Sequence, residues 1–214
     1  MALFGGKGGN SGSSSGVVKN SRHSSGWSQL QKHLRAKDSL RILDIGPTSA
    51  GNINFITDLG HSIYMANLVE DAARPDYQKV VTDGPDAGKT TYDVARFLKE
   101  NLDFAGRTFD VVTLWDTADY LPEPLVDPVI SRIHDVMAPG GQVLAFFHSK
   151  LTGDDTGFAR YHLTATEQLE LQTIGSHPIL HTYTSRQVET LFKRFSSYKF
   201  FLAKDTLREV IVIR

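Results

Sequence analysis

The 214-residue sequence contains no cysteine, which excludes disulfide bonds, thiolate zinc sites and cysteine nucleophiles. It also lacks any apolar run approaching the ~20 residues that a membrane-spanning helix needs. A signal peptide has a sustained apolar core behind a basic start. The first residues of this sequence, MALFGGKGGNSG, lack that pattern. The 8 histidines are scattered and do not pair at zinc-site spacing, so we expect no metal site. These absences predict a soluble cytoplasmic protein.

An excess of charge of either sign is also missing. The 23 basic and 24 acidic residues nearly balance, so the chain as a whole has no electrostatic attraction to nucleic acid or anionic membranes. Its length fits one domain, and chains of this size bury roughly 70% of the surface that the unfolded state exposes. We therefore expect a single domain with a hydrophobic core of its own.

Apolar side chains are scarce in the first 26 residues. Residues 1–26 are rich in Gly and Ser, and such a segment cannot bury enough surface to offset the entropy lost on ordering. We expect a flexible, basic tail here and a Rossmann-like domain over residues 27–214. The basic residues of the tail and of the helix after it are Lys7, Lys19, Arg22, Lys32, Arg35 and Lys37. They favour a solvated tether or, alternatively, a contact with a protein or nucleic acid.

Strand and helix patterns alternate along the rest of the chain. Apolar runs that are typical of strands occupy residues 40–45, 62–66, 80–81, 109–115 and 142–148. Two last runs, 198–203 and 207–214, flank a turn and predict a hairpin. The pattern predicts an α/β fold: a doubly wound, mostly parallel seven-stranded sheet with helices on both faces and a C-terminal antiparallel hairpin.

Polar residues at the starts of the helical segments predict where the helices begin. The expected caps are Thr48 or Ser49, Thr90 or Thr91, Asp127 with Pro128 after it, and Thr184 in a capping box with Gln187.

Residues 80–98, VVTDGPDAGKTTYDVARFL, resemble the start of a nucleotide-binding P-loop, because an apolar run leads into Gly88-Lys89-Thr90 and a helical pattern. Asp83 stands where the P-loop pattern has its first glycine, and its negative charge would face the phosphates. The loop also follows the third expected strand, whereas P-loops usually follow the first. We interpret it as a surface loop, and a P-loop-type nucleotide-binding protein is the third functional hypothesis.

The first strand-to-helix turn is the stronger candidate site. In LRILDIGPTSAGNINFITDLG, residues 40–60, an apolar strand ends in Asp44 and a tight turn begins at Gly46. A glycine permits close backbone approach, and the start of the following helix offers unpaired N–H groups. In a doubly wound sheet, this is the turn where a nucleotide binds.

Three segments of the chain resemble the class I S-adenosylmethionine-dependent methyltransferases. ILDIGPTSAGN resembles their first motif, an acidic residue followed by spaced glycines. FDVVTLWDTADYLPEP is similar to their fourth-strand segment, and SRIHDVMAPGGQVLAFF to the helix, turn and fifth strand that follow. The terminal hairpin resembles their reversed seventh strand. The resemblance implies a Rossmann-like domain that binds S-adenosyl-L-methionine and methylates an acceptor that the sequence does not identify.

The resemblance also implies roles at the cofactor. Asp44 and Gly46 would shape the turn around its methionine part, with Asp44 orienting the loop and, directly or through water, the ammonium group. Thr48 would bond the carboxylate end, and Trp115 and Asp116 would line the reacting face. Each residue also has a purely structural interpretation: Asp44 as a helix cap, Trp115 as core and Asp116 as the cap of a turn.

Two departures from the family pattern concern the cofactor. Thr48 and Ala50 replace the second and third glycines of the first motif, although Gly51 lies one position further on. Asn67 stands where the family usually has an acidic residue that holds both ribose hydroxyls. An amide forgoes two charge-assisted hydrogen bonds, each typically about 1.5–3 kcal/mol. These departures support an alternative hypothesis, a catalytically degenerate methyltransferase-like binding or scaffold subunit.

Methyl transfer to oxygen or nitrogen requires alignment and the removal of a proton. The candidate bases at the carboxyl edge of the sheet are Asp116 and His148, with His162 and His181 farther along. Residues 149–185 are the expected acceptor-side lid, and their mixture of aromatic, His and Arg residues does not define a substrate. The tyrosines that would position an acceptor are Tyr120, Tyr161 and Tyr183.

Overall fold

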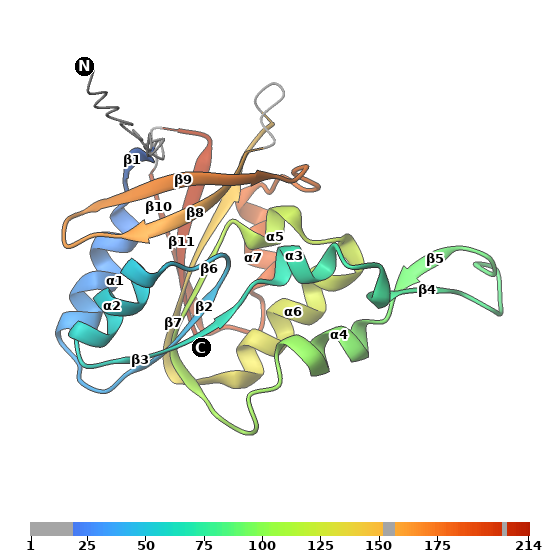
Figure 1. Cartoon of the computed structure of the whole chain (residues 1–214), viewed down its shortest axis with the longest axis horizontal. Coiled ribbons are helices and arrows are strands. Elements are labelled where there is room, and N and C mark those ends of the chain that lie inside the picture. The colour runs from blue at the N-terminus through green and yellow to red at the C-terminus, as the bar shows by residue number, and fades with distance from the viewer. Residues whose placement is uncertain (1–18, 152–156, 203–204) are drawn as a thin grey trace, which may run out of the picture.

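A six-stranded sheet lies at the centre of the molecule (Figure 1). The computed structural model describes residues 19–151, 157–202 and 205–214. The strands of this sheet are β2 (Arg41–Ile45), β3 (Ser62–Ala66), β6 (Phe109–Trp115), β7 (Met137–His148), β10 (Ser197–Phe201) and β11 (Leu207–Ile213). Their order is β10-β11-β7-β6-β2-β3; β3, β2, β6 and β7 are parallel, and β11 is antiparallel to β7 and β10. The expected α/β fold with a C-terminal antiparallel hairpin is confirmed.

The central strands are buried on both sides. In β2, Leu43 and Ile45 belong to one hydrophobic cluster and Ile42 to the other. In β6, Val112 belongs to the first cluster and Val111 to the second. Successive side chains of a strand point to opposite faces, which explains this alternation. A strand that buries both faces is apolar along its whole length, which explains the continuous runs in the sequence.

Helices cover both faces of the sheet (Figure 1). On one side lie α1 (Ser25–Arg35) and α2 (Ala50–Asp58), and on the other lie α3 (Leu68–Ala72), α4 (Val94–Asn101), α6 (Glu123–Val136) and α7 (Ser185–Leu191). Two shorter helices, the 3₁₀ helix η1 (Pro75–Tyr77) and α5 (Thr117–Tyr120), complete the set. Within the described ranges, no helix is long and apolar enough to cross a membrane.

Two of the four expected helix starts are confirmed. Ser49 caps α2 by accepting from the N–H of Asn52, and Thr184 and Gln187 form the capping box of α7. The start of α4 was wrongly expected at Thr90 or Thr91, because these residues are extended and Asp93 is the cap.

The expected start of α6 at Asp127 and Pro128 is also wrong. The helix begins at Glu123, one turn earlier, and contains Pro128 in its interior. Pro124 occupies the early position where the fixed φ of proline favours a helix and its missing N–H removes no bond. The sequence has prolines at both positions, and the earlier one begins the helix.

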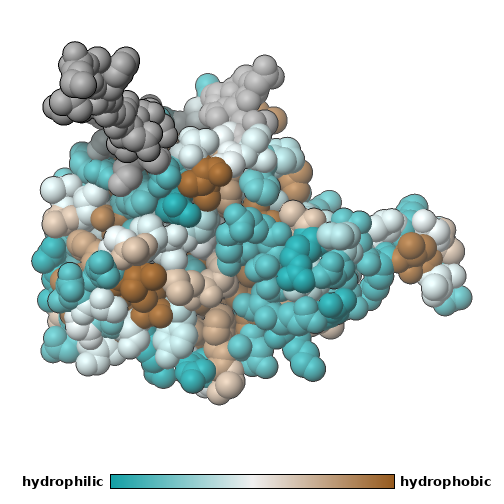
Figure 2. Space-filling view, in the orientation of Figure 1, coloured by the Kyte–Doolittle hydropathy of each residue, from teal (hydrophilic) through white to brown (hydrophobic). Residues whose placement is uncertain are grey.

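The strand expected at Val80 and Val81 does not join the central sheet. β4 (Gln78–Val80) pairs with β5 (Thr90–Tyr92) in a hairpin that projects from the body (Figure 1). The central sheet therefore has six strands rather than seven. All of β4 is exposed, so it offers no apolar face to a sheet. The hairpin carries a hydrophobic spot in Figure 2, and Val80 is 61% exposed.

The P-loop-like residues lie at the tip of this hairpin. Gly84 and Gly88 adopt φ angles of 83° and 86°, which turn the chain back on itself. The ammonium of Lys89 lies 2.6 Å from Oδ1 of Asp86. The segment that follows is strand β5 instead of a helix, so this loop lacks the strand–loop–helix geometry that cradles phosphates.

A second, three-stranded sheet lies across one end of the central sheet (Figure 1). It consists of β1 (Lys19–His23), β9 (Gln168–Ser176) and β8 (Gly157–Leu163), paired antiparallel in that order. β8 and β9 lie within residues 149–185, the expected acceptor-side lid, for which no strands had been predicted. The flexible tail predicted over residues 1–26 is wrong for residues 19–26, which form β1 and the start of α1. Residues 1–18 lie outside the described residues.

Arg22 joins β1 to β11. Its guanidinium pairs with Glu209, and its Nε lies 2.7 Å from Oδ2 of Asp205. Glu209 is 2% exposed and also accepts from the N–H of Gly26 at 2.7 Å and from Ser24 Oγ at 2.9 Å. These bonds satisfy a carboxylate that would otherwise be costly to bury. Arg22 therefore does not belong to a basic surface arm, as the sequence had suggested.

We expect Arg22→Ala to lower the free energy of unfolding by about 3 kcal/mol, because Glu209 would remain buried without its cation. Urea denaturation measures the change. Lys89→Ala is the control, since its pair with Asp86 is exposed and should contribute little. Equal, small losses in the two variants would contradict the anchoring role of Arg22.

Candidate functional site

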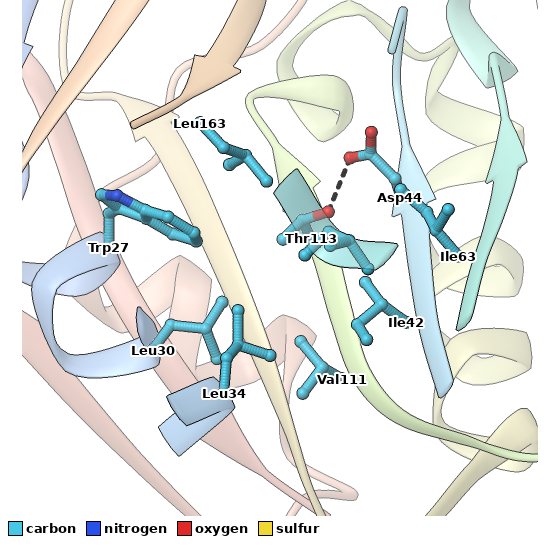
Figure 3. Close-up of a pocket in the computed structure, with 10 residues that line it drawn as sticks. Trp27, Leu30, Leu34, Ile42, Asp44, Ile63, Val111, Thr113 and Leu163 are labelled. Carbon is cyan, nitrogen blue, oxygen red and sulfur yellow. Dashed lines mark hydrogen bonds between the residues drawn. The ribbon is translucent and has the colours of Figure 1, made fainter. Parts of the chain in front are cut away.

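Asp44, at the carboxyl end of β2, is held by two side chains of β6. The register of the two strands pairs Asp44 with Thr113, which places both side chains on one face. Oδ1 of Asp44 accepts from Thr113 Oγ1 at 2.6 Å and from Trp115 Nε1 at 2.7 Å. Figure 3 shows the bond to Thr113 among apolar side chains of α1, β2 and β6. The carboxylate thus ties two strands together and orients an indole.

Burial raises the pKa of Asp44, and the hydrogen bonds from Thr113 and Trp115 oppose this rise. A small cavity of about 10 Å³ adjoins the carboxylate, and Trp27 of α1 is among the residues that line it (Figure 3). This volume compares with the ~10–15 Å³ that one water molecule needs. The carboxylate therefore faces packed core on this side of the sheet.

The turn after β2 brings three strand ends together. Gly46 has a φ of 151°, and a Cβ at this position would lie 3.1 Å from Cδ1 of Trp115. Its N–H donates to the carbonyl of Ala66 at 2.8 Å, and Thr117 Oγ1 donates to the carbonyl of Ile45 at 3.0 Å. Trp115 has a φ of 49°, in the left-handed region that bulky residues avoid. Such strain typically persists where surrounding contacts or function require it.

Two residues expected at the cofactor carry buried polar atoms that lack partners. Among the described residues, neither Thr48 Oγ1 nor Asn67 Oδ1 has a hydrogen-bond partner. The Thr48 hydroxyl lies close enough to Asp44 to oppose the rise of its pKa, but its position does not give a well-formed hydrogen bond. Because buried polar groups are nearly always paired in native proteins, these two atoms are free to bond a ligand at the turn. Gly51 is exposed in the first turn of α2.

Strand β8 covers the Gly46 turn. The ring of Tyr161 stacks on Trp115, with centroids 4.8 Å apart and planes inclined by 4°. Asn52 of α2 donates to the carbonyl of Tyr161 at 2.8 Å and accepts from the N–H of Leu163 at 2.9 Å. The side chain of Asn52 therefore fastens β8 to the start of α2, and the Trp115–Tyr161 stack closes over Gly46.

A pocket of about 200 Å³ lies beyond Tyr161, at the carboxyl ends of β6 and β7. Asp116, Tyr120 and His148 line it together with Tyr161. Asp116 is 4% exposed and accepts from the hydroxyl of Tyr161 at 2.9 Å. Burial raises the pKa of Asp116, whereas the charge of His148 and the bond from Tyr161 lower it. The two residues that the sequence suggested for catalysis thus face one pocket.

His148 is paired with Asp119, a residue that sequence reasoning missed. Oδ2 of Asp119 lies 2.6 Å from Nδ1 of His148 and accepts from its backbone N–H at 2.7 Å. Burial raises the pKa of Asp119 to about 7, and Asp116 adds to the rise while the bonds to His148 oppose it. A carboxylate on Nδ1 fixes the ring and leaves proton exchange to Nε2.

The signal for Asp119 was present in the sequence. It follows Asp116 by three residues in WDTADY, and a helical turn places residues at this spacing on one face. His162 and His181 lie away from the pocket, where they bond the side chain of Gln172 and the carbonyl of Leu121. No group of three or more His, Asp or Glu side chains among the described residues is arranged to hold a metal ion.

We expect Gly46→Ala to destabilise the protein by about 1–3 kcal/mol, because the added Cβ is strained at this φ and meets Trp115. Gly51→Ala is the matched control: its Cβ would make an ordinary 3.6 Å contact with Ser49 Oγ inside a helix. This change should be neutral or stabilising by up to about 1 kcal/mol. Thermal unfolding of both variants measures the difference, and equal melting temperatures would argue against a tight turn.

Comparison with known proteins gives one family match. Residues 23–195 match a family model described as a methyltransferase domain. A search of curated proteins gives no match.

Solved structures of methyltransferases show similar folds. An S-adenosylmethionine-dependent methyltransferase from Mesorhizobium loti is 16% identical, with a TM-score of 0.47. The match covers 86% of this chain and 96% of that protein. Magnesium protoporphyrin IX methyltransferase from Synechocystis, solved with bound S-adenosylmethionine, is 13% identical, with a TM-score of 0.46 and coverages of 88% and 77%. A candidate O-methyltransferase from Nostoc punctiforme is 12% identical, with a TM-score of 0.46; 88% of this chain matches 55% of its length. At these identities, the assignment rests on the family match.

Proposed function

The chain belongs to the methyltransferase domain family, and on this premise we propose that it methylates an oxygen or nitrogen of an acceptor. The observation that supports this most directly is the hydrogen-bonded pair of His148 and Asp119 at a pocket next to the Gly46 turn. Such a pair supplies the proton acceptor that these nucleophiles need. Strands β8 and β9, within the expected acceptor-side segment 149–185, form the acceptor side of the site.

The residues around the Gly46 turn fit S-adenosyl-L-methionine, the cofactor of the family. Thr48 Oγ1 would bond its carboxylate end, and Asn67 Oδ1 would accept from a ribose hydroxyl. Asp44 acts at a distance, by holding Trp115 against the turn. Gly46 would shape the turn around the methionine part of the cofactor, and Gly51, which is exposed in the first turn of α2, leaves the backbone there accessible.

The cofactor supplies a methyl group on a positively charged sulfur, so the acceptor atom must offer a lone pair in line with it. His148 would take the proton of the acceptor at Nε2, while Asp119 holds Nδ1–H and stabilises the imidazolium. Asp116 and Tyr161 would position the acceptor, and Trp115 would line the reacting face.

Calorimetric titration with S-adenosylhomocysteine tests the cofactor site. We expect a dissociation constant below about 100 µM, which corresponds to roughly −5.5 kcal/mol. Thr48→Val and Asn67→Ala should each weaken binding about fivefold, since each removes one hydrogen bond worth about 1 kcal/mol. Lys89→Ala, on the projecting hairpin, is the control and should bind normally. Mg-ATP should give no heat, and binding of ATP alone would favour the P-loop hypothesis instead.

The dyad predicts a pH dependence. Asp119 must be ionised to accept Nδ1–H, so kcat/KM should rise as the pH increases through about 7. His148→Gln should lower kcat by about 10²–10⁴-fold, and Asp119→Asn should lower it by tenfold or more and remove the rise near pH 7. The measurement is release of S-adenosylhomocysteine with hydroxyl and amine acceptors. A wild-type rate in His148→Gln would refute its role as the base.

One observation favours the alternative of a non-catalytic binding or scaffold subunit. Trp115 packs within 3.1 Å of where a Cβ of Gly46 would lie, and Tyr161 stacks on Trp115. This stack and the neutral Asn67 both weaken a cofactor site at the turn. A folded protein that binds no S-adenosylhomocysteine would support this alternative, and Trp115→Ala would then test whether the indole itself blocks the site.

A further inference from the structure

The pocket beyond Tyr161 has walls from both sheets. The central sheet contributes Asp116 and His148 at the ends of β6 and β7, and β8 contributes Gly157 and Ala159. These two small residues leave space between the sheets that larger side chains at the same positions would fill. The pocket is therefore a built feature of the contact between β8 and the central sheet.

Acidic side chains dominate this pocket. Asp116 lines it, and Asp119 lies behind His148. No Lys or Arg is among the described residues that line it. The charge of Arg22 lowers the pKa of Asp116, but its guanidinium is paired with Asp205 and Glu209. A carboxylate or phosphate on the acceptor would meet two buried acids, and His148, which could balance its charge, is already paired with Asp119.

The volume of the pocket limits the acceptor to a small molecule. A cavity of about 150 Å³ holds one benzene molecule, and this pocket measures about 200 Å³. One six-membered ring with one or two small substituents fits, whereas a fused two-ring system or a peptide side chain with its backbone does not. The rings of Tyr120 and His148 meet edge to face, with centroids 6.3 Å apart, and both line the pocket, so an aromatic acceptor in the pocket finds aromatic side chains to pack against.

We propose that the acceptor is a small single-ring compound without an anionic group, with a hydroxyl or amino group directed at His148. This proposal rests on the proposed methyl transfer and defines the class of its substrate. The ring fills the space left by Gly157 and Ala159, and its exchangeable proton passes to His148 as the new bond to the methyl carbon forms. Asp116 excludes anionic analogues by its charge.

The test uses two rings that differ only in charge, 4-hydroxybenzyl alcohol and 4-hydroxybenzoate. Their binding to the full chain is measured by ligand-observed NMR in the presence of S-adenosylhomocysteine. We expect the alcohol to bind at least tenfold more tightly than the carboxylate. A two-ring analogue, 6-hydroxy-2-naphthalenemethanol, should bind at least tenfold more weakly than the one-ring alcohol.

Two pairs of variants locate the effect. Ala159→Leu should abolish binding of the alcohol, whereas Ala165→Leu, the same change at the exposed turn between β8 and β9, should not. Asp116→Asn should reduce the preference for the alcohol over the carboxylate to less than threefold, whereas Asp86→Asn on the projecting hairpin should leave it unchanged. Circular dichroism and the affinity for S-adenosylhomocysteine report on folding, and Asp116→Asn keeps the proposal testable if Ala159→Leu does not fold.

The outcomes separate this proposal from the proposed function. If S-adenosylhomocysteine binds but the neutral ring does not bind, or binds no better than the carboxylate or the two-ring alcohol, the acceptor class is wrong and methyl transfer stands. If S-adenosylhomocysteine itself does not bind, the proposed function fails. If Ala159→Leu binds the alcohol like the unmodified protein, the acceptor does not occupy this pocket and the proposal is overturned.

Discussion

The carboxylate of Asp44 is the contact on which the arrangement of the site depends. It accepts from Thr113 and Trp115, so it fixes the end of β2 to β6 and sets the position of the indole. The indole then lies against Gly46 and carries the ring of Tyr161. One buried carboxylate therefore links the turn after β2 to the strand that covers it. Protonation of Asp44 would weaken its hydrogen bonds with Thr113 and Trp115, because a neutral carboxyl group is a weaker acceptor than a carboxylate.

The small sheet of β1, β9 and β8 converts the edge of a Rossmann-like sheet into an enclosed site. The side chain of Asn52 bonds the backbone of β8, and Arg22 joins β1 to Glu209 of β11. The enclosure keeps Asp119 and Asp116 away from water, and this burial is the main cause of their raised pKa values. In water-poor surroundings, a hydrogen bond between a carboxylate and an imidazole is stronger than at the surface. The small sheet that encloses the pocket therefore also strengthens the hydrogen bond between Asp119 and His148.

Sequence patterns predicted the elements whose residues bury two faces or a regular stripe. The runs LRILDI and FDVVTLW became β2 and β6, and the capping box of Thr184 and Gln187 begins α7. Patterns failed where pairing partners decide the structure. Val80 had no apolar face to offer the sheet, so its strand paired in a projecting hairpin. β8 and β9 were missed although Leu169 and Leu171 alternate with polar residues, because the segment was interpreted as a lid from its mixed composition.

By itself, the sequence determined the α/β alternation and the Gly46 turn after Asp44, because both depend on local spacing, and the resemblance of three segments indicated the family. It also placed Asp116 and His148 at strand ends, which share one edge in any parallel sheet. Only the tertiary structure decided that Asp119 bonds His148, that Trp115 and Tyr161 stack over Gly46, and that a pocket opens beneath β8. These contacts join residues that are far apart in the chain, and strand register and the burial of charge select them. No pattern within a short segment contains that information.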